Sequence, residues 1–234
     1  MSAVYKREMS GYFNSAIAYV VIAMFFFFSG TFFYYDCFRQ DFAGLSYVFG
    51  DMFFITMFII PILTMKTFSE EKRQKTDQAL LTSPASLFEI VLGKFLGALT
   101  IYAVCCSMFL VYGIVLSAFA KPQWSVILCT LLGIFLLGAA LIAINIFISS
   151  LTESMVVAAV VGMGIGMIIA AMDYFINSIP VDWITFIMEK INFLNYYKNF
   201  TYGILSIVDV VFFLSVTGLF LFFTTRILEK RRWS

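Results

Sequence analysis

Histidine is absent from this 234-residue chain, and charged residues make up only 12% of it. The missing histidine removes the commonest metal ligand and the usual general base near neutral pH. A soluble domain carries roughly 25% charged residues. Because 62% of the residues here are hydrophobic, too few polar side chains remain to cover a water-facing globule. The composition predicts a membrane protein, and we expect no catalytic site, metal or cofactor.

A strong net charge is also missing. The formal charge is +1, so the chain lacks the basic field typical of nucleic-acid binders, and we expect no nucleic-acid partner. No C-x-x-C pair occurs among the four cysteines, and only Cys37 falls outside an apolar run. We therefore expect no internal disulfide. The nucleotide-binding pattern G-x-x-x-x-G-K-[ST] is absent as well.

Long apolar runs are what the sequence has in excess. A membrane-spanning helix needs about 20 apolar residues. We expect six such spans, at residues 15–33, 48–65, 95–119, 125–148, 155–176 and 207–225. The fold class predicted from them is an all-α polytopic membrane protein, with one transmembrane domain over residues 1–234.

The basic residues predict the orientation of these spans. Eleven of the 15 lysines and arginines fall on one side of the predicted membrane. They are Lys6, Arg7, Lys66, Lys72, Arg73, Lys75, Lys94, Arg226, Lys230, Arg231 and Arg232. The positive-inside rule places that side in the cytoplasm. We therefore expect a multi-pass protein of the bacterial inner (plasma) membrane, with both termini cytoplasmic and membrane lipid around it.

Two segments have the pattern of helices that lie on the membrane surface. In residues 1–14, the apolar side chains at i, i+4, i+7 and i+8 share one helical face: Tyr5, Met9, Tyr12 and Phe13. The charges of Lys6, Arg7 and Glu8 are assigned to the opposite face, which predicts an interfacial elbow helix. Residues 177–206 are rich in aromatic side chains, as at a membrane interface. We expect one or two short helices there, forming an outer lid.

The connection at residues 66–94 is the most charged stretch of the chain. Thr67 and Glu70 have the spacing of a capping box, and acidic residues precede basic ones, as the helix dipole favours. Residues 80–81 supply an apolar end, and Ser83-Pro84 is expected to stop the helix. The pattern predicts a short charged helix at the cytoplasmic face. This helix either docks on another protein or is a solvated loop whose charges only fix the topology.

Four stretches, taken in order, resemble one family. They are residues 6–19, residues 70–84, Gly93-Lys94-Phe95 and residues 149–153. Together they resemble the permeases of type-2 ABC exporters, in particular the gliding-motility-like permease group. The chain departs from that pattern in two places: Lys75 stands where the family usually has glycine, and Gln78 stands where it usually has an acidic residue.

The resemblance implies that different subunits form the pathway and hydrolyse ATP. ATP hydrolysis would come from a separate ABC ATPase subunit, present in two copies, and two permease copies, identical or paralogous, would form the pathway. The loop at residues 66–84 would act as a coupling helix that contacts the ATPase. The implied coupling residues are Glu70, Glu71, Lys72, Arg73, Thr76, Leu80, Leu81, Pro84 and Glu153.

Candidate residues for the seam between two copies, or for the pathway, lie in the second and fifth spans. Gly162 and Gly166 have the spacing that allows close helix approach in lipid. Packing within one subunit is the alternative for these glycines. Four residues of the second span complete the set: Phe54, Met57, Phe58 and Pro61. For the phenylalanines and the methionine, the alternative is plain core packing or lipid contact.

The middle of every predicted span is free of charge. This argues against a proton- or sodium-coupled carrier, which usually needs ionisable groups near the midplane. It favours an apolar or amphipathic cargo. Two alternatives to an exporter stay open: an ATP-driven membrane subunit that works mechanically on an extracytoplasmic accessory protein through residues 177–206, and an ATP-independent channel or carrier.

Overall fold

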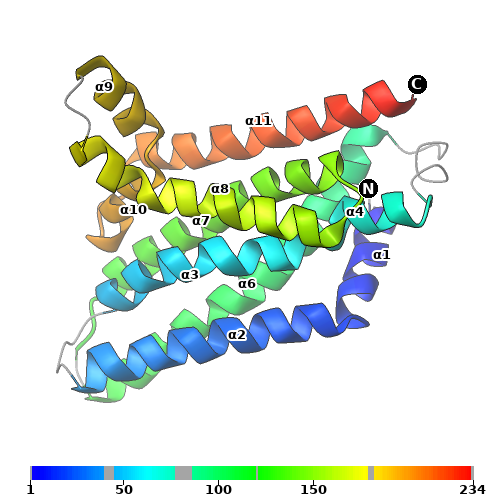
Figure 1. Cartoon of the computed structure of the whole chain (residues 1–234). Helices are drawn as coiled ribbons and strands as arrows, with labels where there is room; N and C mark the ends of the chain where they lie inside the picture. The colour runs from blue at the N-terminus through cyan, green and yellow to red at the C-terminus, as the bar shows by residue number, and fades with distance from the viewer. Residues whose placement is uncertain (1, 40–44, 77–85, 120, 179–181, 233–234) are drawn as a thin grey trace.

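The computed structural model describes residues 2–39, 45–76, 86–119, 121–178 and 182–232, and every regular element in these ranges is helical (Figure 1). Six of the described helices are long and apolar enough to cross a membrane. They are α2 (Ala16–Phe33), α3 (Ser46–Thr64), α6 (Leu87–Phe119), α7 (Trp124–Leu151), α8 (Met155–Ser178) and α11 (Ile207–Arg232). A short π-helical segment, η1 (Tyr34–Arg39), continues α2. The six predicted spans are confirmed as helices.

The third span begins earlier than predicted. Its helix starts at Leu87 rather than at residue 95. Ser86 caps this start: its hydroxyl accepts from the Glu89 amide at 3.2 Å, and the Glu89 carboxylate accepts from the Ser86 amide at 3.3 Å. This reciprocal pair is a capping box, a motif that the sequence pattern predicted at Thr67 and Glu70 instead. The helix therefore carries a polar turn outside the apolar run.

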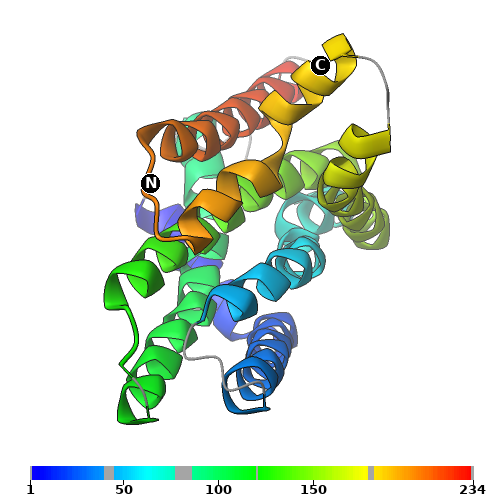
Figure 2. The ribbon, with the colours of Figure 1, turned by 90° about the vertical axis from the view of Figure 1, so that its left-hand side faces the viewer.

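Helix α7 forms the centre of the bundle. In α7, 78% of the most apolar stretch is buried, whereas only 28% of the corresponding stretch is buried in each of α2, α8 and α11. Both chain termini lie at one end of the bundle, here called the terminal end (Figure 1). The opposite end, here called the lid end, carries α9 (Asp182–Ile191) and α10 (Phe193–Thr201). Figure 2 looks onto the lid end and shows α10 lying across the bundle, with α9 at its edge.

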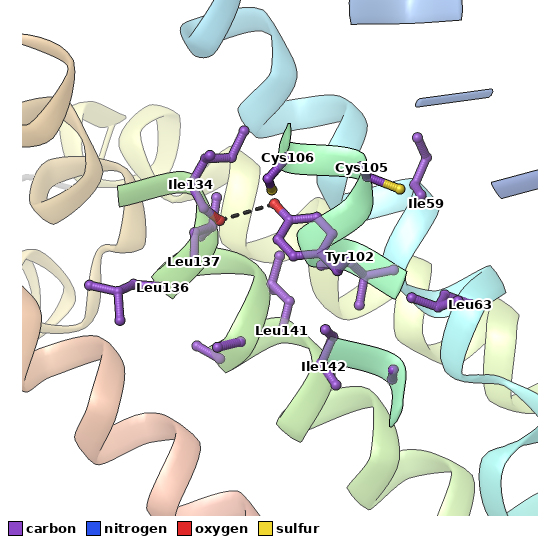
Figure 3. Close-up of a cluster of buried hydrophobic side chains, with 14 of the residues drawn as sticks. Ile59, Leu63, Tyr102, Cys105, Cys106, Ile134, Leu136, Leu137, Leu141 and Ile142 are labelled. Atoms are coloured by element: carbon purple, nitrogen blue, oxygen red, sulfur yellow. Dashed lines mark hydrogen bonds between the residues drawn. The ribbon is translucent and has the colours of Figure 1, made fainter. Parts of the chain in front are cut away.

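Aromatic and small residues interlock in the middle of the bundle. The ring of Tyr102, on α6, lies between residues of α3 and α7, and its hydroxyl donates to the Ile134 carbonyl at 3.0 Å (Figure 3). A Cβ at Gly138 of α7 would overlap this ring. The glycine therefore lets α7 approach α6 closely enough to bury the tyrosine. All four cysteines are buried.

The lid is joined to the bundle by polar contacts. Lys198 of α10 forms an ion pair of 2.7 Å with Asp173 of α8. The Tyr197 hydroxyl donates to the Phe49 carbonyl of α3 at 2.8 Å, and the Thr130 hydroxyl of α7 donates to the Phe200 carbonyl at 2.9 Å. Helix α10 is thus fixed across the ends of three spans.

Candidate functional site

The charged helix at the terminal end is an extension of the second span. Helix α4 (Lys66–Arg73) follows α3 through Met65, which keeps right-handed helical dihedral angles (φ −54°, ψ −34°). The predicted capping box of Thr67 and Glu70 is therefore wrong, because α4 has no separate N-terminus to cap. Helix α4 itself ends at Arg73, and the predicted stop at Ser83-Pro84 lies outside the described residues. A rigid extension of a span moves with that span.

A Schellman motif ends α4. The Thr76 amide donates to the Glu71 carbonyl at 3.0 Å, and the Lys75 amide donates to the Lys72 carbonyl at 3.1 Å. Lys75 has φ +57°, in the left-handed region. Glycine is the residue that adopts this conformation without strain. The structure thus gives a physical reason for the glycine that the resembled family usually has at this position.

Lys75→Gly is expected to stabilise the end of α4 by about 1 kcal/mol, because it removes the cost of the left-handed conformation. Hydrogen exchange of the Thr76 amide should slow about fivefold, since that amide is protected by its bond to Glu71. Gln74→Gly is the control. Gln74 has φ −84°, so glycine there gains nothing, and exchange should stay equal or become faster. Unchanged or faster exchange in Lys75→Gly would contradict this account of the helix end.

A buried lysine joins three helices beside α4. The Lys94 side chain, at the start of α6, is 1% exposed. Its ammonium donates at 2.9 Å to each of three oxygens: a Glu8 carboxylate oxygen from α1 (Ser2–Phe13), a Glu71 carboxylate oxygen from α4 and the Thr67 carbonyl. An ammonium has three N–H donors. All three donors of Lys94 are therefore used within the chain.

Arg7 completes this group of charges. Its guanidinium donates to Glu71 at 2.8 Å and to Glu8 at 3.2 Å. Two cations and two carboxylates thus meet, and the group, here called the Lys94 network, is neutral. Burying ionised groups is costly unless each is paired and hydrogen-bonded. The network satisfies this condition for Lys94, which fixes α1, α4 and α6 relative to one another.

Glycines let α1 lie against α6. A Cβ at Gly93 would come within 2.9 Å of Val4, and a Cβ at Gly97 would come within 3.1 Å of the Glu8 Cβ. Helix α1 runs across the ends of the spans (Figure 1), as an elbow helix should. Glu8, however, faces the protein. Its assignment to the charged outer face is wrong, because Lys94 supplies a buried partner.

The turn that ends α7 is hydrogen-bonded to α4. The Ser149 hydroxyl accepts from the amides of Phe68 and Ser69 at 3.1 and 3.2 Å and donates to the Met65 carbonyl at 3.1 Å. The Lys72 ammonium donates to the Ser150 carbonyl. Helix α4 is thus attached to the central helix of the bundle as well as to α1 and α6.

A cleft of about 370 Å³ opens between α1 and α4. Its lining is Arg7, Glu8, Gly11, Tyr12, Lys66, Thr67, Glu70, Glu71, Gln74, Thr76 and Lys94. Burial raises the pKa of the Tyr12 phenol well above its usual range; the Thr67 hydroxyl opposes this shift and the Glu8 carboxylate adds to it. Tyr12 therefore stays protonated at neutral pH. The Lys66 ammonium lies 5.3 Å from the centre of its ring.

The predicted coupling residues separate into two groups. Glu71 and Lys72 point into the protein and are held there by the bonds described above. Arg73, Thr76 and Glu153 are exposed, and Glu70 is partly exposed. Leu80, Leu81 and Pro84 lie outside the described residues. The exposed members gather at the free end of α4 and at the neighbouring turn after α7.

Sequence reasoning missed the partners of α4. Lys94 was counted as a charge that fixes topology, Arg7 and Glu8 as surface charges, and all three as parts of the resembled stretches; no contact between them was predicted. One signal was present: Gly93 and Gly97 flank Lys94 at a spacing of one helical turn, which indicates that another element comes close. Nothing in that pattern, however, identifies α1 as the element.

The predicted seam residues also fall into two groups, one buried within the subunit and one exposed. A Cβ at Gly162 would overlap the Asn145 side chain of α7, and a Cβ at Gly166 would come within 3.0 Å of the Met57 carbonyl of α3. That carbonyl has no helical amide donor because residue 61 is proline. The two glycines therefore pack within the subunit, and Met57 and Pro61 are buried with them. In contrast, Phe54 and Phe58 are 45% and 41% exposed.

One protein-family model matches most of the chain. The sequence model of a family described as ABC-2 family transporter protein matches residues 3–225. The match runs from α1 into α11 and includes every helix that contributes to the Lys94 network. No curated protein shows a significant match to the chain.

Proposed function

The chain belongs to the ABC-2 family of transporter membrane proteins, and from this premise we propose that it is the permease subunit of an ATP-driven exporter. Membrane subunits of this family are typically non-catalytic, so a separate ABC ATPase, in two copies, supplies the hydrolysis. The terminal end faces the cytoplasm of a bacterial inner membrane, where the ATPase is found. Membership of the gliding-motility-like group remains a prediction.

The observation that carries this proposal is the attachment of α4. It extends span α3 without a break, and bonds from Lys94 and Ser149 attach it to α1, α6 and α7. A displacement of α4 by the ATPase therefore reaches four helices of the bundle at once. A solvated loop that only fixed topology would not need a buried lysine to hold it.

The exposed end of α4 supplies the surface for the ATPase. Arg73, Gln74, Lys75 and Thr76 are exposed there, and Glu153 is exposed on the adjacent turn. These side chains form a polar patch of mixed charge, which suits an interface with a water-soluble subunit. Glu71 and Lys72 then hold α4 in place rather than touching the partner.

Two copies of the chain, or this chain and a paralogue, pair through α3 and α8. The exposed side chains of α3 fall at i, i+4, i+7 and i+11 on one stripe: Tyr47, Asp51, Phe54 and Phe58. On the neighbouring α8, Val160, Met167 and Ile168 are exposed, and Gly164 has open space beside it. Apart from Asp51 near its lid end, this face is largely apolar and suits both a second membrane subunit and an apolar or amphipathic cargo.

Reversing two exposed charges, with Arg73→Glu and Glu153→Lys, is expected to weaken ATPase binding about tenfold or more. The measurement is the affinity of the purified chain in detergent for the ATPase that co-purifies with it. Lys230→Glu, an exposed lysine at the same end on α11, is the matched control and should leave the affinity unchanged. Undiminished binding and ATP-driven activity in the double variant would refute the coupling role of this surface.

A second candidate function is supported by α9. Trp183, Phe186 and Ile187 lie on one face of this helix and are 68%, 62% and 48% exposed. In this alternative, the ATP-driven subunit works on an extracytoplasmic partner seated on α9 instead of moving a cargo. A structure of the complex with a partner on α9, and no continuous cavity between two copies, would favour it over export.

A further inference from the structure

Three polar atoms around the cleft between α1 and α4 lack hydrogen-bond partners. Within the described part of the chain, the Tyr12 hydroxyl, the Thr67 hydroxyl and one carboxylate oxygen of Glu71 are buried and make no hydrogen bond of normal geometry, although the two hydroxyls lie near enough for Thr67 to affect the Tyr12 pKa. Tyr12 is 2% exposed and Thr67 is 3% exposed. All three residues line the cleft. Buried polar atoms in folded proteins are nearly always hydrogen-bonded, so three unpaired atoms around one cleft indicate that a partner binds there.

The chemistry of these three unpaired atoms indicates what kind of partner they need. The Glu71 oxygen belongs to a carboxylate and only accepts hydrogen bonds. The two hydroxyls can donate or accept. The Lys94 ammonium has no N–H left to give, and the other two cations of the lining, Arg7 and Lys66, make no hydrogen bond to these three atoms. The cleft therefore needs donors. A group with several N–H donors and a positive charge meets this need best, because charge-assisted hydrogen bonds to carboxylates are the strong ones.

We propose that this cleft receives a basic side chain, arginine or lysine, from the ATPase subunit. The N–H groups of that side chain donate to the Tyr12 and Thr67 hydroxyls and to the free Glu71 oxygen. This inference rests on the proposed function, since it states what the partner inserts beside α4. The Lys94 network then has a second role, because it holds Glu71 with one oxygen bound and the other presented to the partner.

The surroundings of the cleft favour a protein side chain over other occupants. Its rim includes Gln74 and Thr76, which are exposed at the polar free end of α4, next to the predicted ATPase surface. An anionic ligand such as phosphate would be repelled by the free Glu71 oxygen, and the lining cations Lys94 and Arg7 are already paired with Glu8 and Glu71.

The double variant Tyr12→Phe/Thr67→Val tests the proposal, because it removes two hydroxyls that have no partner within the described chain. Deleting unpaired buried hydroxyls is neutral or stabilising for an isolated protein. The thermal midpoint of the purified chain should therefore stay equal or rise, while its affinity for the ATPase falls about tenfold. Tyr5→Phe is the control on the same helix. It deletes a hydroxyl that bonds Thr100 at 3.0 Å outside the cleft, and affinity should be unchanged.

Cross-linking gives an independent readout. A photoreactive side chain at Gly11, which lines the cleft and has open space beside it, should cross-link to an ATPase segment that contains arginine or lysine. Full affinity in the double variant, while Arg73→Glu/Glu153→Lys weakens binding, would overturn the inference and leave the proposed function standing. Failure of the wild-type chain to bind any ATPase would overturn both. A thermal shift by phosphatidylethanolamine added to the detergent micelles, lost in the double variant, would assign the cleft to a lipid amine and overturn the inference.

Discussion

Lys94→Met is expected to reduce the free energy of unfolding by about 3 to 5 kcal/mol, the cost of removing one partner from a buried ion group. The variant leaves the carboxylates of Glu8 and Glu71 facing each other with side chains only 14% and 19% exposed. Arg7 remains, but its side chain is 55% exposed and contacts the two carboxylates from the solvent side. Denaturant titration in mixed micelles measures the loss.

Two controls show whether the stability loss in Lys94→Met comes from the unpaired charges or from altered packing. The triple variant Glu8→Gln/Glu71→Gln/Lys94→Met removes the stranded charges and should recover most of the lost stability, because neutral replacements of a buried ion group are often tolerated. Arg7→Gln removes an exposed partner and should cost about 1 kcal/mol or less. A Lys94→Met variant no less stable than Arg7→Gln would show that the network does not hold these helices together.

Gly162→Ala is expected to destabilise the bundle by about 1 to 3 kcal/mol, the usual cost of inserting a methyl group where there is no space. The new methyl group would overlap the side-chain oxygen of Asn145 and come within 3.0 Å of Pro61. Helix α8 would have to move away from both α3 and α7. The thermal midpoint of the purified chain in detergent should fall.

Matched variants test the steric origin of that loss. Gly164→Ala, two residues along the same helix, meets no atom within 4 Å and should be neutral or slightly stabilising. Asn145→Ala combined with Gly162→Ala makes room for the methyl group and should recover stability. The Asn145 oxygen has no hydrogen-bond partner in the described chain, so the substitution gives up only the bond from the Asn145 amide nitrogen to the Leu141 carbonyl, 2.9 Å away in the same helix. Equal effects of the Gly162 and Gly164 variants would contradict the packing described for α8.

Features with a local signal could be predicted from the sequence. Apolar length alone located the six spans, and the face formed by Tyr5, Met9 and Tyr12 indicated the elbow helix. The order of charges after the second span indicated a short helix at the terminal end. Each of these patterns lies within one continuous stretch of the chain, so the sequence contains all the information that they need.

Features that depend on contacts between distant residues could not be predicted. Glu8 looks like a surface charge until Lys94, 86 positions along the chain, is placed beside it. The end of α4 at Arg73 was not predicted, because Lys75 gives no glycine signal at the left-handed position. Gly162 and Gly166 indicated close helix approach, but only the fold shows that the neighbours are Asn145 and Met57 of the same chain.

One measurement tests most directly whether α4 and its neighbours move as one body when the ATPase acts. Spin labels are placed in turn at Lys6→Cys, Lys75→Cys and Glu153→Cys, exposed sites on α1, after α4 and after α7; the native cysteines are buried. Distances between the two copies are then compared with and without ATP. If the helices move as one body, all three pairs change together and by similar amounts. A change at Lys75→Cys without one at Lys6→Cys and Glu153→Cys would contradict this coupling.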